Sequence, residues 1–215
     1  MSTKKIVFIV AMDSEAKYIK TKFNMKIKEI YNANFSEYLV SEKHPGMSML
    51  VTGIGVSNVL MAISSFFKAQ KSFDIENTEF INIGYAGSPF YKIGSVLEIS
   101  AVKRFFEAKK VKDLNKHIEF TPFSPKGKLD KAILYTADDF IEKKEIHGKD
   151  WAVDMEGYYI ACILQNLHIF KIVSDNLSLK QYDESNNDRL LRDAWKTGLT
   201  VIEKKYLEDL KTNKD

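Results

Sequence analysis

The sequence has 215 residues, and its 32 Lys plus Arg against 29 Asp plus Glu give a formal net charge of +3 at pH 7. The charges are spread along the chain without a basic block, so nucleic acid is not an expected partner. No stretch approaches the roughly 20 apolar residues of a membrane span, so we expect no membrane insertion. With 45% hydrophobic residues, the chain can bury a sizeable core, and we expect a single domain over residues 1–215.

The sequence contains a single cysteine, Cys162, which excludes an intramolecular disulfide and any Cys-x-x-Cys motif. This usage fits a reducing compartment, so we expect the protein to be cytoplasmic. The histidines do not have the spacing of metal ligands, and we expect no metal site. They are His44, His117, His147 and His168.

The first part of the chain alternates apolar runs rich in β-branched residues with segments of helical periodicity. This alternation is typical of a largely parallel sheet whose strands are connected by helices, and it predicts the α/β class. The expected elements, in chain order, are a strand over 5–11, a helix over 13–23, a hairpin of strands over 38–40 and 47–52, a glycine turn over 53–55 and a helix from about 57 to 67.

The same alternation continues toward the end of the chain, with one interruption. A strand over 79–83 is expected to end in a second glycine turn, Gly84-Tyr85-Ala86-Gly87. Residues 103–131 are rich in lysine and lack a regular pattern, so we expect a long loop there. The other expected elements are strands over 96–102, 132–135, 151–154 and 168–173, and helices over 137–141 with Thr136 as its cap, 157–167 and 184–211.

Three carboxyl residues follow expected strands: Glu15, Glu156 and Asp175. Ligands of open α/β sheets bind at the carboxyl ends of the strands, where a partly buried carboxyl can hold a proton near neutral pH. Asp175 is therefore a candidate acid that protonates a leaving group. Glu156 has the two oxygens needed to accept hydrogen bonds from vicinal ribose hydroxyls, and Met155 offers a polarizable contact to the sugar.

Each of these residues also has an ordinary structural interpretation. Ser174 and Asp175 are preferred caps of a turn or helix. Glu15 lies in the first turn of an expected helix, where a carboxylate complements the helix dipole or forms a surface ion pair. Taken residue by residue, the structural interpretation is the commoner one, and both stay open at this point.

Six motifs together resemble the family of 5'-methylthioadenosine/S-adenosylhomocysteine nucleosidases, within the nucleoside phosphorylase superfamily. They follow that family's order along nearly the whole chain. Singly each motif is common, but six in register are not expected by chance. The motifs are Ile9-Val10-Ala11-Met12-Asp13-Ser14-Glu15, Thr52-Gly53-Ile54-Gly55, Asn82-Ile83-Gly84-Tyr85-Ala86-Gly87, Thr136-Ala137-Asp138-Asp139-Phe140-Ile141, Ala152-Val153-Asp154-Met155-Glu156 and Ile172-Val173-Ser174-Asp175.

The resemblance implies a three-layer α/β/α sandwich around a central twisted mixed sheet. It also implies a homodimer that hydrolyses the bond between a purine and a ribose without a metal or other cofactor. In this scheme Asp175 protonates N7 of the base, Ser174 holds Asp175 in place, and Glu15 orients the attacking water. Protonation makes the base a better leaving group, and the carboxylates favour the positive charge that develops on the sugar.

The resemblance also implies the contacts to the substrate. Glu156 binds the ribose hydroxyls beside Met155, the main chain at Ile141 reads the adenine edge, and Phe140 packs against the ring. The other expected substrate contacts are Met12, Ile54, Tyr85, Ala86, Gly87, Val153 and Asp154.

Two residues depart from the family pattern. Tyr85 stands where the family usually has a small serine, and we expect its bulk to alter the cavity near the ribose or its 5' substituent. Lys171 stands where the family usually has an arginine, and a lysine cannot reproduce the bidentate fork. The related futalosine hydrolases, which cleave a purine nucleoside with a different 5' arm, are therefore an alternative.

Two further alternatives concern the reaction itself. The superfamily includes phosphorolytic enzymes, which need positive charge to hold phosphate. The loop after the first strand carries Asp13 and Glu15 and no arginine, and no arginine precedes Gly84, so the sequence favours water as the nucleophile. A nucleoside-binding module without turnover is the alternative from another class, but such a module has no need of Glu15 and Asp175.

Overall fold

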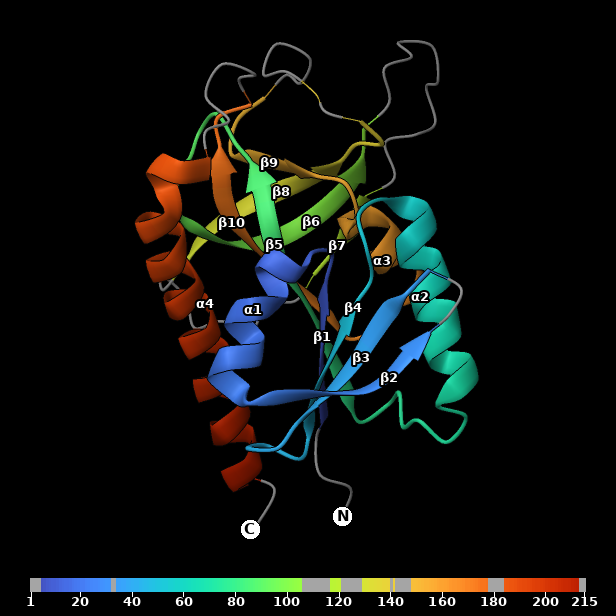
Figure 1. Cartoon of the computed structure of the whole chain (residues 1–215). Coiled ribbons are helices and arrows are strands. Elements are labelled where there is room, and N and C mark those ends of the chain that lie inside the picture. Colours follow the sequence, from blue (N-terminus) through green and yellow to red (C-terminus); the bar gives the residue numbers. More distant parts are fainter. Residues whose placement is uncertain are drawn as a thin grey trace.

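The computed structural model describes residues 5–31, 34–105, 117–120, 129–139, 141, 148–177 and 184–212. Within these residues it contains ten strands and four helices (Figure 1). The strands are β1 (Lys5–Val10), β2 (Met25–Tyr31), β3 (Ser36–Ser41), β4 (Met47–Val51), β5 (Thr78–Gly87), β6 (Val96–Arg104), β7 (His117–Glu119), β8 (Asp130–Thr136), β9 (Trp151–Asp154) and β10 (Leu167–Asp175). The helices are α1 (Asp13–Phe23), α2 (Val56–Ala69), α3 (Gly157–Ile163) and α4 (Glu184–Thr212).

The strands form one mixed sheet in the order β10-β6-β8-β9-β5-β1-β4-β3-β2, with β7 paired to β6. β1, β4, β5 and β10 run parallel where they pair, whereas β2, β3 and β4 form an antiparallel meander. β10 also pairs with β5, so β5, β10, β6, β8 and β9 form a closed circuit of neighbouring strands. The expected mixed sheet and the hairpin of β3 and β4 are confirmed.

Helices cover both faces of the sheet, with α1 and α4 on one side and α2 and α3 on the other (Figure 1). The alternation of side chains along β1 divides its residues between the two layers. Ile6, Phe8 and Val10 belong to the core under α1 and α4. Val7 and Ile9 belong to the core under α2 and α3. The three-layer arrangement is therefore built on a central strand that is buried on both faces.

The expected glycine turn at residues 84–87 is wrong, because β5 continues through it to Gly87. These glycines allow close contact instead. A Cβ atom on Gly84 would lie 2.6 Å from Oε1 of Glu15, and one on Gly87 would lie 2.7 Å from Oδ1 of Asp175. Both distances are too short for real atoms. The absent side chains let the strand pass directly beside two carboxyl groups.

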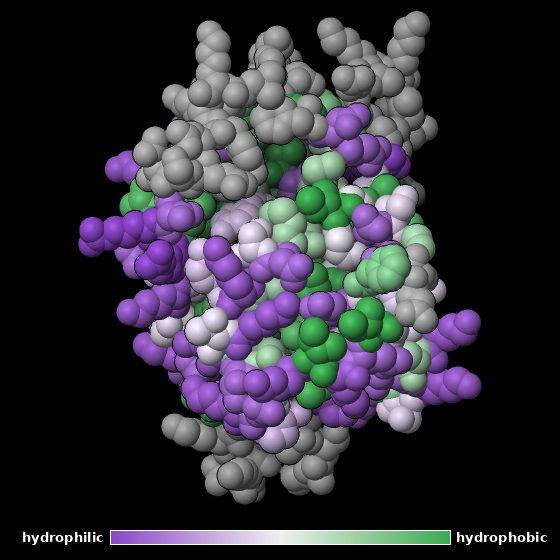
Figure 2. Space-filling view, in the orientation of Figure 1, coloured by the Kyte–Doolittle hydropathy of each residue, from purple (hydrophilic) through white to green (hydrophobic). Residues whose placement is uncertain are grey.

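Strand β2 was not expected, and its exposure explains why. Between Met25 and Tyr31 its side chains do not alternate regularly, and Ile27 and Ile30 are 52% and 51% exposed. β2 lies at the edge of the sheet, and its register to β3 shifts between Ile27 and Glu29. Figure 2 shows hydrophobic residues among charged ones on this face of the molecule. An irregular edge strand of this kind lacks the period of two by which strands are recognised.

Other expected boundaries also need correction. Residues 137–139 are not helical, and Thr136 ends β8 instead of capping a helix there. The Thr136 hydroxyl accepts a hydrogen bond from the Tyr158 N–H at 2.8 Å, so it satisfies the first turn of α3. That helix ends at Ile163, and β10 already begins at Leu167. Within the expected loop over 103–131, the structure has the short strand β7.

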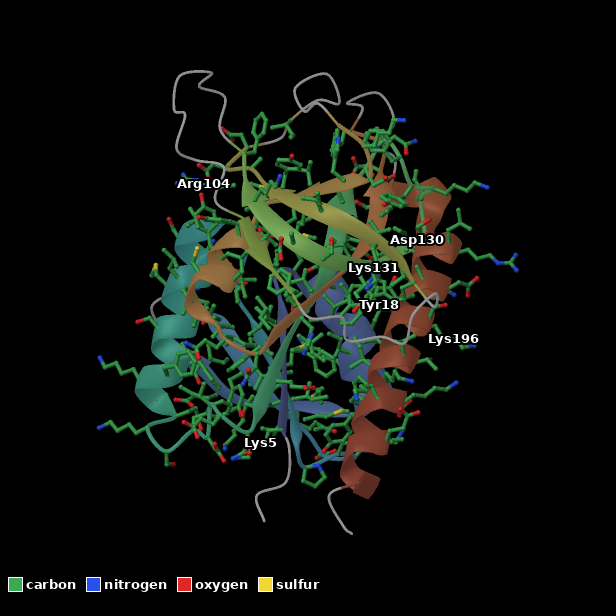
Figure 3. The ribbon with its side chains drawn as sticks, turned by 180° about the vertical axis from the view of Figure 1, so that it is seen from behind. Lys5, Tyr18, Arg104, Asp130, Lys131 and Lys196 are labelled. Atoms are coloured by element: carbon green, nitrogen blue, oxygen red, sulfur yellow. The ribbon has the colours of Figure 1, made fainter. Side chains whose placement is uncertain are left out.

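No helix in the described part of the chain is long and apolar enough to cross a membrane. The longest helix, α4, packs one face against the sheet through buried residues that include Trp195, Leu199 and Ile202. Its other face carries charged residues, as the view from behind shows for Lys196 (Figure 3).

The aromatic contact between α1, α4 and β5 generates a stability prediction. Trp195 is fully buried, stacks on Tyr18 at 5.1 Å between ring centroids, and meets Tyr85 edge-on at 5.9 Å. Trp195→Ala should lower the free energy of unfolding by roughly 3–5 kcal/mol, since it removes a large buried ring. Leu207→Ala, at a position that is 39% exposed on the same helix, is the control and should cost less than about 1 kcal/mol. Urea denaturation measures both, and equal losses would contradict the role of Trp195.

Candidate active site

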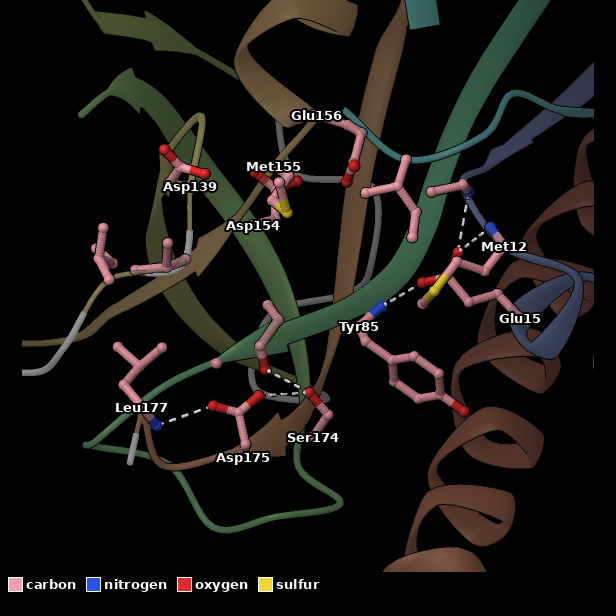
Figure 4. Close-up of a pocket in the computed structure, with 16 residues that line it drawn as sticks. Met12, Glu15, Tyr85, Asp139, Asp154, Met155, Glu156, Ser174, Asp175 and Leu177 are labelled. Carbon is pink, nitrogen blue, oxygen red and sulfur yellow. Dashed lines mark hydrogen bonds between the residues drawn. The ribbon is translucent and has the colours of Figure 1, made fainter. Parts of the chain in front are cut away.

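One cavity of about 220 Å³ lies where β1, β5, β9 and β10 come together (Figure 4). β1, β5 and β10 are parallel, so their carboxyl ends share one edge of the sheet. β9 arrives differently, because it crosses the end of β5 antiparallel with Val153 opposite Gly87. The cavity is lined by Ala11, Met12, Glu15, Ile54, Tyr85, Ala86, Gly87, Asp139, Ile141, Val153, Asp154, Met155, Glu156, Ser174, Asp175 and Leu177.

All but one of the predicted site residues line this cavity. Phe140 lies outside the described residues, so its predicted contact with the base stays a prediction. Ala11, Asp139 and Leu177 line the cavity as well and are not among the predicted site residues. Ala11 and Asp139 belong to motifs already quoted, whereas Leu177 follows Asp175 by two residues and carried no signal of its own.

Glu15 is held by the backbone on both of its carboxylate oxygens. Its Oε2 accepts hydrogen bonds from the N–H groups of Ala11 and Met12 at 2.9 and 3.0 Å, and its Oε1 accepts one from Tyr85 at 2.7 Å. The residue is 3% exposed, so it does not form a surface ion pair. Burial raises the pKa of Glu15, and the nearby charge of Lys171 and the three N–H donors offset this only in part.

Asp175 and Ser174 end β10 and face the cavity. Oδ2 of Asp175 accepts a hydrogen bond from the Ser174 hydroxyl at 2.9 Å, and Oδ1 accepts one from the Leu177 N–H at 2.8 Å. The second contact is the turn cap that the structural interpretation expected. Asp175 therefore stabilises the following turn and at the same time presents its carboxyl group to the cavity, so the two interpretations are compatible.

Glu156 comes to the cavity from the turn between β9 and α3. Its Oε1 accepts a hydrogen bond from the Gly55 N–H at 2.8 Å, which ties it to the glycine turn before α2. The carboxyl group points into the cavity (Figure 4). Burial and then the neighbouring Asp154 raise the pKa of Glu156 to about 7, against the opposing effects of Lys171 and the Gly55 N–H. This carboxyl therefore changes its charge near neutral pH.

Asp154 lines the same cavity, but its oxygens are engaged within the protein. Oδ1 accepts a hydrogen bond from the Thr136 hydroxyl at 2.6 Å, and Oδ2 accepts one from the Gly157 N–H at 2.8 Å. Oδ2 also lies 2.8 Å from Nζ of Lys171. These contacts make Asp154 a link between β8, α3 and β10, in addition to its predicted place at the site.

The Tyr85 side chain points toward α4, away from Glu156 (Figure 4). Its ring packs edge-on against Trp195, and its N–H is the donor to Glu15. Burial raises the pKa of the Tyr85 hydroxyl, so it stays protonated. The ring forms one wall of the cavity and is held by the core behind it.

On the opposite side of the cavity, an apolar cluster lies next to Asp175. It contains Ile141, Val153 and Leu177, which pack together with Ala137 and Trp151. In the part of the chain that the structure describes, no group of three or more His, Cys, Asp or Glu side chains is arranged to hold a metal ion. The expectation of a reaction without metal or cofactor stays a prediction.

The raised pKa of Glu156 predicts a particular dependence of stability on pH. Between pH 4.5 and about 7 the folded state binds more protons than the unfolded state, so this group makes the protein less stable as the pH rises. The loss reaches up to about 3 kcal/mol. Glu156→Gln keeps an acceptor for Gly55 but cannot ionise, so its stability relative to the wild type should rise with pH across this window. Urea denaturation at several pH values measures it, with exposed Glu208→Gln as control. Parallel curves for Glu156→Gln and the wild type would contradict it.

No model of a protein family matches the sequence, and neither does any curated protein. Solved structures match over nearly the whole chain. A 5'-methylthioadenosine/S-adenosylhomocysteine nucleosidase from Helicobacter pylori is 17% identical, with a TM-score of 0.72 over 97% of this chain and 100% of that one. The 5'-methylthioadenosine nucleosidase of Arabidopsis thaliana is also 17% identical, with a TM-score of 0.76 over 95% and 97%. The futalosine hydrolase of Helicobacter pylori is 19% identical, with a TM-score of 0.64 over 98% of both chains. The chain thus has the fold of these nucleosidases.

Proposed function

We propose that this protein is a purine nucleosidase that hydrolyses the N-glycosidic bond of 5'-methylthioadenosine/S-adenosylhomocysteine-type nucleosides to free adenine and the ribose product. The observation that carries the proposal is the convergence of Glu15, Glu156 and Asp175 on one cavity at the ends of the strands. Each carboxyl is held by hydrogen bonds from the surrounding chain. The fold shared with nucleosidases supports the same conclusion.

In this proposal the base lies beside Asp175. The apolar cluster of Ile141, Val153 and Leu177 offers a dry surface for a flat purine ring. Asp175 acts as the acid that donates a proton to N7 of the base, and the electrons of the breaking glycosidic bond move into the ring. Ser174 and the Leu177 N–H hold the two carboxyl oxygens in place for this transfer.

The ribose lies between Glu156 and Glu15. Glu156 accepts hydrogen bonds from the vicinal hydroxyls while Gly55 fixes its Oε1, and Met155 packs against the sugar. As the bond to the base breaks, positive charge develops on the sugar and the carboxylates stabilise it. Glu15 orients a water molecule for attack on the anomeric carbon and accepts its proton. Its three backbone donors keep it fixed during this step.

The charge of the cavity supports water over phosphate as the nucleophile. Five carboxyl residues line it: Glu15, Asp139, Asp154, Glu156 and Asp175. The ammonium group of Lys171 lies beside them, but it is already paired with Asp154 at 2.8 Å. A phosphate ion would meet net negative charge in this environment, and phosphorolytic sites supply positive charge instead.

A second candidate is hydrolysis of a purine nucleoside with a different 5' arm, such as futalosine. Tyr85 is the observation behind it, because its ring stands at the cavity wall where the family usually has a small serine, so the 5' group that fits beside it is expected to differ. The futalosine hydrolase among the similar structures shares the fold with a TM-score of 0.64. Both candidates use the same carboxyl groups and differ in the 5' substituent.

The proposed substrate implies a part in methionine salvage in the cytoplasm. The homodimer implied by the resemblance also belongs to this proposal.

The proposed acid and the proposed water-orienting residue give separable predictions. Asp175→Asn should lower kcat for adenine release from methylthioadenosine by at least about a hundredfold, because the amide cannot donate the acid's proton. Glu15→Gln should lower kcat more than it changes KM. Asp130→Asn, at an exposed position at the start of β8 (Figure 3), is the matched control and should retain activity. Near-normal turnover by Asp175→Asn would remove it as the acid, and an unchanged kcat in Glu15→Gln would show that another group positions the water.

The proposed effect of Tyr85 on specificity is tested with two substitutions. Tyr85→Phe keeps the ring against Trp195, so the relative kcat/KM values for adenosines with different 5' groups should not change. Tyr85→Ser removes the ring and widens the cavity, so these ratios should shift toward larger 5' groups. Rates for methylthioadenosine, adenosylhomocysteine and adenosine measure both effects. Identical ratios in Tyr85→Ser and the wild type would rule out Tyr85 as a specificity residue.

A further inference from the structure

Lys171 is a charged residue in the middle of a buried strand. It lies in β10 between apolar neighbours and is 2% exposed. Taking an ammonium group out of water costs several kcal/mol unless opposite charge and hydrogen bonds compensate it. A lysine at such a position therefore has to be explained by what surrounds its Nζ atom.

The surroundings of Nζ are carboxylates of the candidate active site. Oδ2 of Asp154 lies 2.8 Å away, and the charges of Glu156 and Glu15 act on it as well. Burial lowers the pKa of Lys171, but these carboxylates outweigh that effect and leave it above its ordinary value. Lys171 therefore carries a positive charge next to Asp154, which lines the cavity.

The partner of Lys171 also fixes the turn that carries Glu156. Asp154 accepts hydrogen bonds from Thr136 at the end of β8 and from the Gly157 N–H at the start of α3. A Cβ atom on Gly157 would lie 2.9 Å from Oδ2 of Asp154, so the turn is closely packed around this carboxylate. Glu156 lies between the two residues that this contact joins.

We propose that Lys171 is a positioning residue of this site, which acts through Asp154 to hold the turn bearing Glu156 and supplies the positive charge that lets Glu156 accept hydrogen bonds from a ribose. The inference deepens the proposed nucleosidase function and rests on it for the ligand. It does not require Lys171 to touch the substrate.

The charges around Glu156 predict in which direction its titration midpoint moves when Lys171 or Asp154 is replaced. Asp154 from its own segment and Glu15 from α1 favour the protonated form of Glu156, whereas Lys171 from β10 favours the ionised form. Removal of Lys171 alone leaves Asp154 uncompensated, so Glu156 should lose its proton at a higher pH. Removal of both charges together should return the titration toward that of the wild type, because their effects on Glu156 are opposite.

The experiment compares Lys171→Met, Lys171→Arg and the double variant Lys171→Met/Asp154→Asn with the wild-type protein. Titration of the Glu156 carboxyl by carbon NMR, assigned with Glu156→Gln, gives its midpoint, and the pH profile of kcat/KM gives the effect on nucleoside cleavage. We expect Lys171→Met to raise the midpoint of the Glu156 titration, and the acidic limb of the kcat/KM profile, by at least about one pH unit. Below the midpoint this shift corresponds to a tenfold loss of kcat/KM. Lys171→Arg keeps the charge and should restore the wild-type positions.

Lys196→Met is the control, since Lys196 is exposed on α4 and should leave the Glu156 midpoint unchanged (Figure 3). An unchanged midpoint in Lys171→Met, or a double variant that titrates like Lys171→Met, would overturn the proposal. If Lys171→Met does not fold, the double variant and Lys171→Arg decide: the proposal requires both to fold and both to titrate near the wild type. Absence of cleavage by the wild-type protein would contradict the proposed function alone, because the NMR titration tests Lys171 without turnover.

Discussion

The close approach of β5 to two carboxyl groups is the constraint on which the candidate site depends. Gly84 and Gly87 have no side chains, so Glu15 packs directly against the first and Asp175 against the second. The same strand donates its Tyr85 N–H to Glu15 and pairs with β10 and β9. A proposed base and a proposed acid are thus held on either side of a single extended strand, at distances that the sheet itself fixes.

Burial of several carboxyl groups in one cavity costs desolvation free energy, and two features of the surrounding structure offset it. Backbone N–H groups bind Glu15 and Glu156, and these donors need no side-chain ordering. Lys171 pairs with Asp154 and places one positive charge among the carboxylates. The remaining negative charge destabilises the folded protein, but it stabilises the positive charge that would develop on a sugar bound there. Such fixed charges are the preorganisation expected of a site that cleaves a glycosidic bond.

The sequence predicted the fold class and nearly all of the cavity, for reasons that particular residues make clear. Apolar strands such as β1 and β10 stand out as continuous apolar runs, and Glu15, Glu156 and Asp175 lie at or shortly after the ends of β1, β9 and β10. The interpretation of residues 84–87 as a turn was wrong because glycine serves close contact as well as turning. β2 was missed because an exposed edge strand has no regular alternation.

The contacts that link β8, β9 and β10 around Asp154 could not be predicted from local sequence patterns. Asp154, Thr136 and Lys171 are far apart in the sequence or belong to different strands, so their network depends on the register of β8, β9 and β10. Leu177 joins the cavity only because the chain turns back after Asp175. Residues that act through tertiary contacts leave little trace in spacing or periodicity.

The most direct test of the account is chromatographic detection of free base after the protein is incubated with methylthioadenosine, adenosylhomocysteine, adenosine, inosine and futalosine, each with and without phosphate. We expect release of adenine from methylthioadenosine-type nucleosides at the same rate with and without phosphate. Release that requires phosphate would contradict water as the nucleophile, and no release from any of these nucleosides would contradict the assignment of Glu15, Glu156 and Asp175 to this chemistry.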